Sequence, residues 1–378
     1  MKVLVHISAN IYKPLPNSGH TSLIWKELSK SFDKYHVLAR GESRYKKAKS
    51  CDGIINLHLL PMISRSQIWS LLLIFHQVVF LCKTRPTHII CQCPVLGGGA
   101  AYIYKKFICN KVRLVFEIHG EHLLRARSAS YYSKLEFLFF RMLGRLTIKE
   151  ANVVRSLSRE MTNNIVAVYG NSISLDNIKY IPNRVDVKLF NCELKERNLD
   201  KSTINLITVG NFSPIKNHLK LIENLSEIDV NFRLTIVGGG ELRSEYYKKI
   251  EQLGLQDRVK VIGPFAHAEL VKEYSNNDIY IHYSLTEGFP RVILEAQSCG
   301  LPVISSNVGY ISDILSDGEN VILLKDYTPE SLKEKLDYIM IEDNHIRIKE
   351  NGRIHVLKNF DSTVIYDKYR KVILGEEE

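Results

Sequence analysis

Short apolar segments alternate with amphipathic segments along most of the chain. The first half begins with the apolar run MKVLVHIS, and HTSLIWKELSKSF then places apolar residues at helical spacing. The runs THIICQCPV, VRLVFEIHG and ANVVRSLS are each followed by another helical pattern. Short apolar strands that alternate with helices are typical of parallel sheets with helices on both faces. The pattern therefore predicts an α/β fold.

The alternation stops at the polar, non-periodic segment NCELKERNLDKSTI, which is typical of a linker, and then starts again. The apolar runs that follow are INLITVGNF, RLTIVGGGEL, RVKVIGPF, DIYIHYS, LPVISSN and NVILLKD. We predict two doubly wound domains, 1–190 and 200–360, and a helix in 361–378 that packs back toward the first domain. Ligands of open parallel sheets bind beyond the carboxyl ends of the strands, so two facing domains would enclose a cleft for a small molecule.

The stretch TEGFPRVILEAQSCG (286–300) contains a turn and the start of a helix directly after a predicted strand. Pro290 suits the first helical position, and Gly300 suits the end of the helix. Free backbone amides would then lie at a helix N-terminus, where a phosphate or diphosphate binds. The residues of this predicted anion site are Gly288, Phe289, Pro290, Arg291 and Val292.

Two glutamates flank this predicted anion site. Glu287 lies on the loop, and Glu295 lies about two turns into the helix, pointing back toward the same opening. Because a carboxylate repels a phosphate, we expect both to accept hydrogen bonds from hydroxyl groups of a sugar or a ribose. Alternatively, both favour the helix dipole, which explains Glu287 more readily than Glu295.

Several motifs, in the same order along the chain, resemble family 4 of the retaining glycosyltransferases. These motifs are EIHGE (117–121), IPNRVDVKLF (181–190), VGNFSPIKNHLKLIE (209–223), RLTIVGGGEL (233–242), VKVIGPF (259–265), and Glu287-x7-Glu295 followed by AQSCGLPVISSN. The resemblance implies the GT-B fold, in which two Rossmann-like domains face each other across a cleft. It also implies a nucleotide-diphosphate sugar as the donor.

The resemblance assigns roles to single residues. Glu295 would bind the ribose hydroxyls and Glu287 the donor sugar, while Lys216 would neutralise the diphosphate. Phe265 would border the base. The amides after Gly288 would bind phosphate.

Two further roles fall in the first domain. Gly19 resembles the glycine whose backbone approaches the donor phosphates, and His119 resembles the histidine that hydrogen-bonds the transferred sugar. We therefore expect His119 and Glu287 to be the catalytic residues. By resemblance, the departing phosphate oxygen deprotonates the acceptor hydroxyl on the same face, which gives retention.

One position departs from the family pattern. Asn211 stands where the family usually has an arginine beside the lysine, and an amide offers only a neutral hydrogen bond. Arg184 or Arg291 could supply the missing positive charge, and both alternatives stay open. The chain also lacks Asp-x-Asp, so we expect no metal and no other cofactor.

The charge is distributed unevenly. Residues 1–190 carry 28 Lys and Arg against 11 Asp and Glu, a balance of +17 within a total of +10. We therefore expect a glycan or lipid-linked acceptor, of a lipopolysaccharide or surface-polysaccharide type, at an anionic membrane surface. The stretches 68–82 and 134–146 suit either helices at a membrane surface or ordinary core-facing helices, and the first is too short to span a bilayer.

Other classes fit less well. No secretory signal pattern opens the sequence, and the seven cysteines form no zinc-type motif, so we expect a cytoplasmic protein at the inner face of the membrane. The three glycines of VGGGEL lack the spacing of a dinucleotide fingerprint. No nucleic-acid recognition motif appears despite the basic pI. We favour a UDP-sugar donor, and the alternative is a non-catalytic relative that binds nucleotide sugars.

Overall fold

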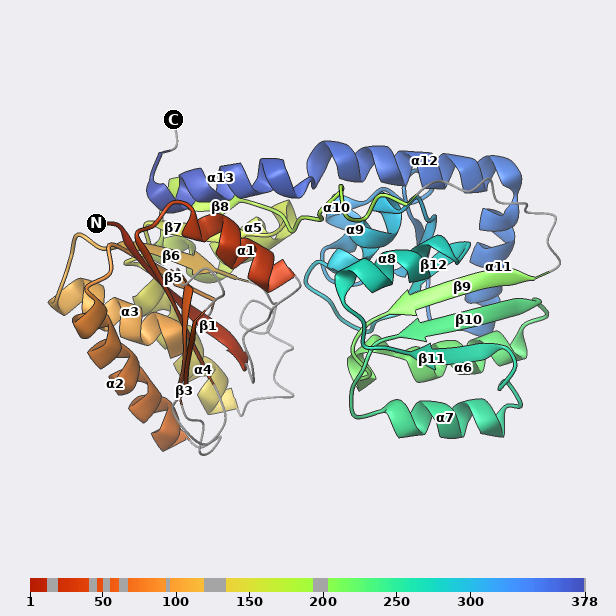
Figure 1. The fold of residues 1–378 in the computed structure, drawn as a ribbon, viewed down its shortest axis with the longest axis horizontal. Helices are drawn as coiled ribbons and strands as arrows, with labels where there is room; N and C mark the ends of the chain where they lie inside the picture. Colours follow the sequence, from red (N-terminus) through yellow and green to blue (C-terminus); the bar gives the residue numbers. More distant parts are fainter. Residues whose placement is uncertain are drawn as a thin grey trace. The chain divides into compact units, whose positions relative to one another are not determined.

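The structure is a computed structural model that describes residues 1–11, 20–40, 46–49, 55–60, 67–92, 96–118, 134–192 and 203–376. It contains two compact units, which are described separately below (Figure 1). The first unit comprises Met1–Pro182 and Tyr366–Glu378, and the second comprises Asn183–Ile365. The change of unit therefore falls eight residues before the predicted end of the first domain.

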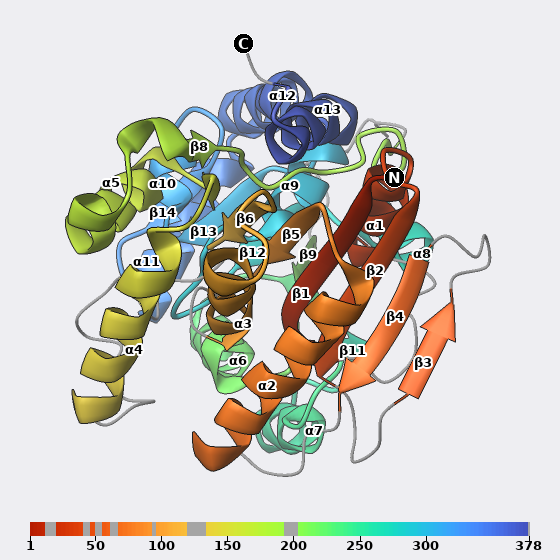
Figure 2. The same ribbon diagram turned by 90° about the vertical axis from the view of Figure 1, so that its left-hand side faces the viewer.

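The first unit is built on an eight-stranded sheet in the order β3-β4-β2-β1-β5-β6-β7-β8. All pairings are parallel except that of β3 with β4. The strands are β1 (Val3–Ile11), β2 (Lys34–Arg40), β3 (Lys46–Lys49), β4 (Ile55–Leu60), β5 (His88–Cys91), β6 (Arg113–Glu117), β7 (Val153–Ser156) and β8 (Ile178–Tyr180). The helices are α1 (His20–Ser29), α2 (Gln67–Thr84), α3 (Leu96–Phe107), α4 (Lys134–Ile148), α5 (Arg159–Tyr169) and most of α13 (Ser362–Leu374). Helices α2 and α3 lie side by side (Figure 2).

The second unit has a six-stranded, fully parallel sheet in the order β11-β10-β9-β12-β13-β14. Its strands are β9 (Ile204–Val209), β10 (Phe232–Val237), β11 (Val259–Ile262), β12 (Ile279–His282), β13 (Val303–Ser306) and β14 (Ile322–Leu324). Its helices are α6 (His218–Glu227), α7 (Arg243–Gln252), α8 (His267–Ser275), α9 (Arg291–Ser298), α10 (Ile311–Ile314), α11 (Pro329–Met340) and α12 (Glu342–Asn359).

Neighbouring residues of the central strands in this unit enter two different cores. On β9, Leu206 belongs to one apolar cluster and Ile207 to another, because successive side chains of a strand point to opposite faces. On β12, Ile281 and Tyr280 divide in the same way. Burying each such side chain contributes about 1.5–3 kcal/mol, so both faces of the sheet need helices to cover them. The predicted doubly wound α/β architecture is confirmed.

A buried polar cluster closes the first unit around its last helix. The guanidinium of Arg155 on β7 donates to the carboxylate of Glu117 on β6 at 2.8 Å. It also donates to the carbonyls of Ile181 and Pro182 at 2.9 and 3.0 Å. The hydroxyl of Tyr369 on α13 donates to Glu117 at 2.5 Å. These contacts fasten α13 and the segment leaving β8 to the carboxyl ends of β6 and β7.

Candidate functional site

The two central strands of the second unit end side by side. In sequence order β9 is the first strand of this sheet and β12 the fourth, yet they are neighbours, so the strand order reverses between them. In open parallel sheets, ligands bind at such a switch point, beyond the carboxyl ends of the strands. The loops after both strands meet there, because the amide of Leu285 donates to the carbonyl of Ile215 at 2.8 Å.

The loop after β9 delivers Lys216. A 3₁₀ turn, Pro214–Lys216, is followed by Asn217 in the left-handed conformation at φ 56°, and α6 then begins. The aliphatic part of Lys216 lies over Gly210, where a Cβ atom would come within 3.2 Å of two lysine carbons. A side chain at Gly210 would therefore crowd the lysine and force it to shift from its position over the loop.

Glu287, on the loop after β12, accepts hydrogen bonds from three side chains. Lys216 Nζ donates to Oε1, and the same oxygen accepts from Ser284 Oγ at 3.0 Å. The Nε2 atom of the buried His282 lies 3.4 Å away, and its Nδ1 atom lies 3.1 Å from Ser305 Oγ. A proton on Nε2 lets His282 donate to Glu287, while the single hydroxyl hydrogen of Ser305 is shared between His282 Nδ1 and the carbonyl oxygen of Ser306, which lies 3.0 Å from Ser305 Oγ. The carboxylate is thus fixed in one orientation.

This environment keeps Glu287 ionised. Burial alone would raise its pKa, but the hydrogen bond from His282 and the positive charge of Lys216 outweigh that effect and lower the pKa to about 2. Burial lowers the pKa of His282, so the imidazole is neutral at pH 7. Lys216 is therefore the cation that balances the carboxylate. An ionised carboxylate only accepts hydrogen bonds, as sugar hydroxyls require.

The N-terminus of α9 follows Glu287 directly. The helix begins at Arg291 with Pro290 as its N-cap, one residue later than the sequence pattern predicts. The first amides of a helix have no partner within it, so they are available to an anion. The turn before the helix is held by its carbonyls: Asn183 Nδ2 donates to Phe289 at 2.8 Å, and the Tyr310 amide donates to Gly288 at 3.2 Å.

A close backbone approach fixes the same turn from the β13 side. Gly309 has φ +62°, and a Cβ atom there would lie 2.0 Å from the carbonyl oxygen of Glu287. Only glycine fits this combination of conformation and space. The loop after β13 therefore supports the loop that carries Glu287.

Glu295 lies inside α9 and is only 2% exposed. The hydroxyl of Tyr274 on α8 donates to its Oε2 atom at 3.2 Å. Burial raises the pKa of Tyr274 well above its ordinary value, so the phenol remains a donor. This contact orients the carboxylate of Glu295. Its assignment to the ribose hydroxyls remains a prediction.

Three other predicted residues are placed by the structure. Asn211 is exposed on the loop after β9, and Phe265 is 38% exposed after the cis Gly263–Pro264 bond that follows β11. Arg184, one of the two candidates to compensate for Asn211, is buried. Gly19 and His119 lie outside the described residues.

Two residues of this region were missed from the sequence. Arg243 on α7 donates to the carbonyls of Gly238 and Gly263 at 2.8 and 2.6 Å, and thereby joins the loops after β10 and β11. The only sequence signal was the glycine run after β10, whose exposed carbonyls need donors. Asn183 was noticed as part of a motif, but its bond to the turn before α9 was not predicted.

The comparisons with known proteins concern the family and the fold. Residues 192–355 match the profile of the family described as Glycosyl transferases group 1. The N-acetyl-alpha-D-glucosaminyl L-malate synthase of Bacillus anthracis is 25% identical over 278 residues, which cover 72% of this chain and 70% of that protein. The second unit therefore carries the sequence pattern of the group 1 glycosyltransferases, as the motifs of that part of the sequence predicted.

Two solved structures show the same fold over nearly the whole chain. The HepE protein of Anabaena, in complex with UDP and glucose, has a TM-score of 0.75 at 17% identity and covers 99% of this chain and 100% of its own. WaaG, a glycosyltransferase involved in lipopolysaccharide biosynthesis, has a TM-score of 0.74 at 15% identity and covers 98% and 100%. The predicted GT-B fold is confirmed.

Proposed function

We propose that this protein is a glycosyltransferase that moves a sugar, with retention of configuration, from a nucleotide-diphosphate sugar to a hydroxyl of a glycan or lipid-linked acceptor. The observation that carries the proposal is the pairing of Lys216 with an ionised Glu287 at the switch point of the second sheet. The ammonium group of Lys216 and the amides at the helix N-terminus suit the diphosphate, and the carboxylate beside them suits sugar hydroxyls.

The diphosphate would be bound by the amides at the start of α9 and by Lys216. Phosphate oxygens compete with Glu287 for the lysine, because all are anionic acceptors of the same ammonium group. As the bond between the sugar carbon and the phosphate oxygen breaks, negative charge grows on the leaving diphosphate. A cation and a helix N-terminus fixed beforehand stabilise that charge. This part of the proposal needs no metal ion.

Glu287 would accept hydrogen bonds from the donor sugar, and Glu295 from the ribose. Because the pKa of Glu287 is lowered to about 2, the carboxylate keeps this role across the physiological pH range. Phe265, on the loop after β11, has an exposed ring that would border the base. UDP is the favoured nucleotide, and the complex of HepE with UDP supports that choice by similarity of fold.

In the transfer step, the bond from the sugar carbon to the phosphate oxygen breaks and a bond to the acceptor oxygen forms on the same face. The acceptor proton passes to the departing phosphate oxygen, so no protein nucleophile is required. His119 would hydrogen-bond the transferred sugar near the reacting carbon. This assignment rests on the EIHGE motif of the sequence.

The acceptor is proposed to lie at an anionic membrane surface, at the inner face of the cell membrane. Helix α4 exposes Leu138, Met142 and Leu146 at a spacing of four residues, with Arg141 and Arg145 between them. An exposed apolar stripe between arginines suits a helix lying on an anionic bilayer. Across the described residues, no helix has the length and apolarity needed to cross a membrane.

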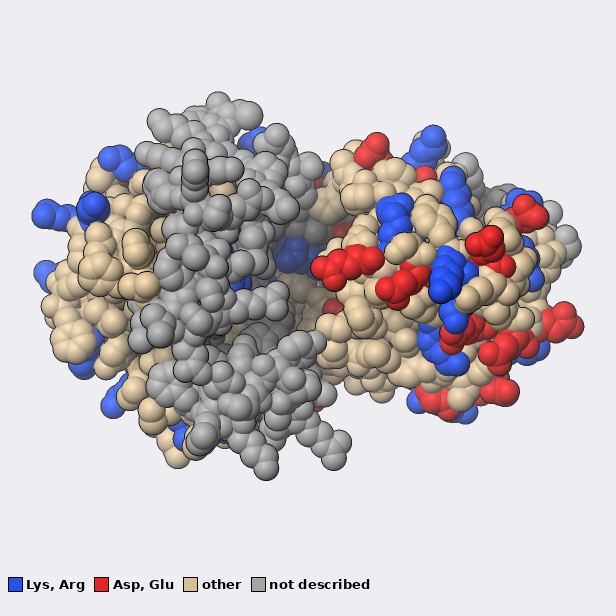
Figure 3. Space-filling model, turned by 90° about the horizontal axis from the view of Figure 1, so that it is seen from below, with Lys and Arg blue, Asp and Glu red and all other residues tan. Residues whose placement is uncertain are grey.

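The charge of the first unit agrees with such a surface. On the face drawn in Figure 3, acidic side chains gather on the second unit, mixed with Lys and Arg, whereas the charged side chains seen on the described surface of the first unit are mostly Lys and Arg. Each basic residue near an anionic leaflet contributes about 1 kcal/mol. The similarity of fold to WaaG makes a lipopolysaccharide or surface-polysaccharide acceptor the favoured class.

The transfer reaction tests the proposal directly. Purified protein is incubated with UDP-, GDP- and ADP-sugars and membrane lipid extract, and NMR records the anomeric configuration of the product. We expect transfer from a UDP-sugar with the donor's configuration retained, resistant to EDTA and reduced in Lys216→Ala. A product of inverted configuration would overturn the mechanism, and absence of transfer with retained nucleotide binding would favour a non-catalytic relative.

A further inference from the structure

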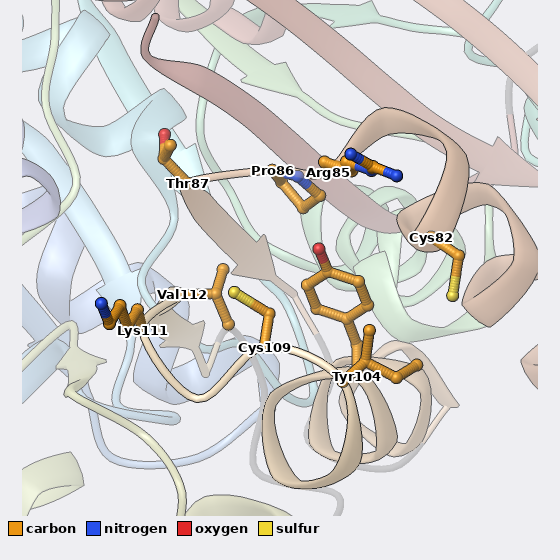
Figure 4. A pocket seen from close by; sticks show the side chains of 9 residues that line it. Cys82, Arg85, Pro86, Thr87, Tyr104, Cys109, Lys111 and Val112 are labelled. Carbon is orange, nitrogen blue, oxygen red and sulfur yellow. The ribbon is translucent and has the colours of Figure 1, made fainter.

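A pocket of about 540 Å³ lies in the first unit, at the amino ends of β5 and β6. The last turns of α2 and α3 and the segments entering the two strands form its walls (Figure 4). Its lining residues are Cys82, Arg85, Pro86, Thr87, Tyr104 and Ile108, followed by Cys109, Lys111 and Val112. Acceptor chemistry is expected at the opposite, carboxyl edge of this sheet, and four-residue strands separate the two edges by roughly 10 Å or more.

The pocket contains a tyrosine hydroxyl that faces its open space. Tyr104 is 3% exposed, and among the described residues nothing forms a hydrogen bond with its hydroxyl. Figure 4 shows the ring between Cys82 and Cys109, with the hydroxyl directed toward Pro86 and Arg85. Burial raises the pKa of Tyr104, so the phenol stays protonated and remains a donor at neutral pH. The hydroxyl is therefore available to an oxygen acceptor that enters the pocket.

The charged groups of the pocket have one sign. Arg85 and Lys111 are exposed at opposite ends of Figure 4, and neither forms an ion pair with a described residue. No acidic side chain is among the lining residues. The two cations offer donors only and the phenol hydroxyl can add a third donor, which matches the oxygens of a phosphate or carboxylate.

The backbone at Arg85 is unusual. This residue ends α2 in the left-handed conformation, at φ 48°, where glycine is the ordinary choice. The arginine is therefore present despite a conformational cost, so a role for its side chain is the simplest explanation. The same fact supplies a clean variant, because Arg85→Gly removes the cation while relieving the backbone.

We propose that this pocket is a second ligand site, separate from the donor site, that binds the phosphate group of a small phosphomonoester. Arg85 and Lys111 bind its charge and Tyr104 donates to one oxygen. Ile108 and Val112 contact its apolar part. Phe107, next to Ile108, is exposed and adds apolar surface beside the pocket. The phosphomonoester can therefore be either a lipid head group or a free metabolite.

The two thiols in the wall provide the test. Alkylation of Cys82 and Cys109 by iodoacetamide is followed by peptide mass spectrometry, with glycerol 1-phosphate or dihexanoyl phosphatidic acid as the probe. We expect each effective probe to slow alkylation at one or both thiols in a saturable way. Arg85→Gly and Tyr104→Phe should each raise the probe concentration needed for half-maximal protection about tenfold, as expected for the loss of one hydrogen bond to a charged group.

Lys83→Gln is the matched control, since it removes one exposed cation from the last turn of α2 outside the pocket. It should leave protection unchanged. Protection by the soluble ester would indicate a free phosphomonoester, and protection by phosphatidic acid alone would indicate a lipid. No protection by either probe, or equal loss in Lys83→Gln, would overturn the site. Lys216→Ala should leave protection intact, which separates this inference from the donor site.

Discussion

The ammonium group of Lys216 donates a hydrogen bond to the carboxylate of Glu287, although 71 residues separate them in the sequence. The sheet order brings them together, because β9 and β12 are adjacent and both residues follow the carboxyl ends of these strands. The pair links the expected phosphate-binding and sugar-binding groups of the donor site. We therefore expect Lys216 to change its partner from Glu287 to the diphosphate when the donor binds.

Only the substitution of Lys216, and not that of Glu287, should weaken nucleotide binding. Lys216→Ala removes a charged donor to phosphate, so UDP affinity should fall about 10- to 100-fold in calorimetry. Glu287→Gln frees the lysine from its anionic partner, so UDP affinity should be unchanged or higher while transfer falls. A parallel loss of nucleotide affinity in both variants would show that Glu287 does not compete with phosphate.

Buried His218 should make the second unit sensitive to mild acid. Burial, then the charge of Lys216, lowers its pKa from 6.5 to about 3. Between pH 6.5 and about 3, His218 is protonated in the unfolded chain but neutral in the folded chain. The free energy of unfolding therefore falls as the pH falls from 6.5 toward 3. This residue contributes up to about 1.4 kcal/mol per pH unit in that window.

Urea unfolding of wild type and His218→Gln at pH 7, 6, 5 and 4 measures this contribution. The variant should lose stability less steeply with acid than wild type. Identical slopes would mean that the buried imidazole is not the group that titrates.

Gly309→Ala should weaken the donor site through the backbone alone. The new methyl group would overlap the carbonyl oxygen of Glu287 at a positive φ, so unfolding free energy should fall by at least about 1–3 kcal/mol. Gly318→Ala is the matched control, because it has φ +75° and no atom within 4 Å of the added carbon. Differential scanning calorimetry should show a larger loss of stability for Gly309→Ala than for Gly318→Ala. Equal losses would show that the overlap with the carbonyl of Glu287 does not reduce stability.

The apolar stripe of α4 should control binding to anionic vesicles. Leu138→Ser and Met142→Ser each remove exposed apolar area, so co-sedimentation with phosphatidylglycerol vesicles should weaken about tenfold per substitution. Binding should also weaken with added salt. Ile354→Ser, an exposed position on α12 of the second unit, should change nothing. If the substitutions on α4 do not change vesicle binding, α4 is not the element that binds the membrane.

The spacing of apolar residues along the chain was sufficient to predict the α/β fold and the helix that carries Glu295. Local signals also placed Glu287 on the loop before that helix, since strand, turn and proline lie within a few residues. Contacts between distant segments could not be derived in this way. The bonds from Lys216 to Glu287 and from Asn183 to Phe289 depend on which strands are neighbours, and sequence distance does not determine that.

Other features carry almost no sequence signal. Strand β3 (Lys46–Lys49) contains three lysines and pairs antiparallel at the edge of the sheet, where polar residues are tolerated. Arg243 forms hydrogen bonds to two loops, but nothing in the sequence distinguishes it from the many other Lys and Arg residues. Such contacts can be identified only when the fold has placed their partners.

The most direct test of the central claim is a thermal-shift titration of UDP, GDP and ADP against wild type, Lys216→Ala and Lys248→Ala. Lys248 is an exposed lysine on α7 outside the site. A ligand at about 100 times its dissociation constant stabilises a fold by about 2.7 kcal/mol, a readily measured shift. We expect stabilisation by one nucleotide diphosphate, UDP, that survives in Lys248→Ala and is lost in Lys216→Ala. An equal shift in all three proteins, or no shift with any nucleotide, would contradict this expectation.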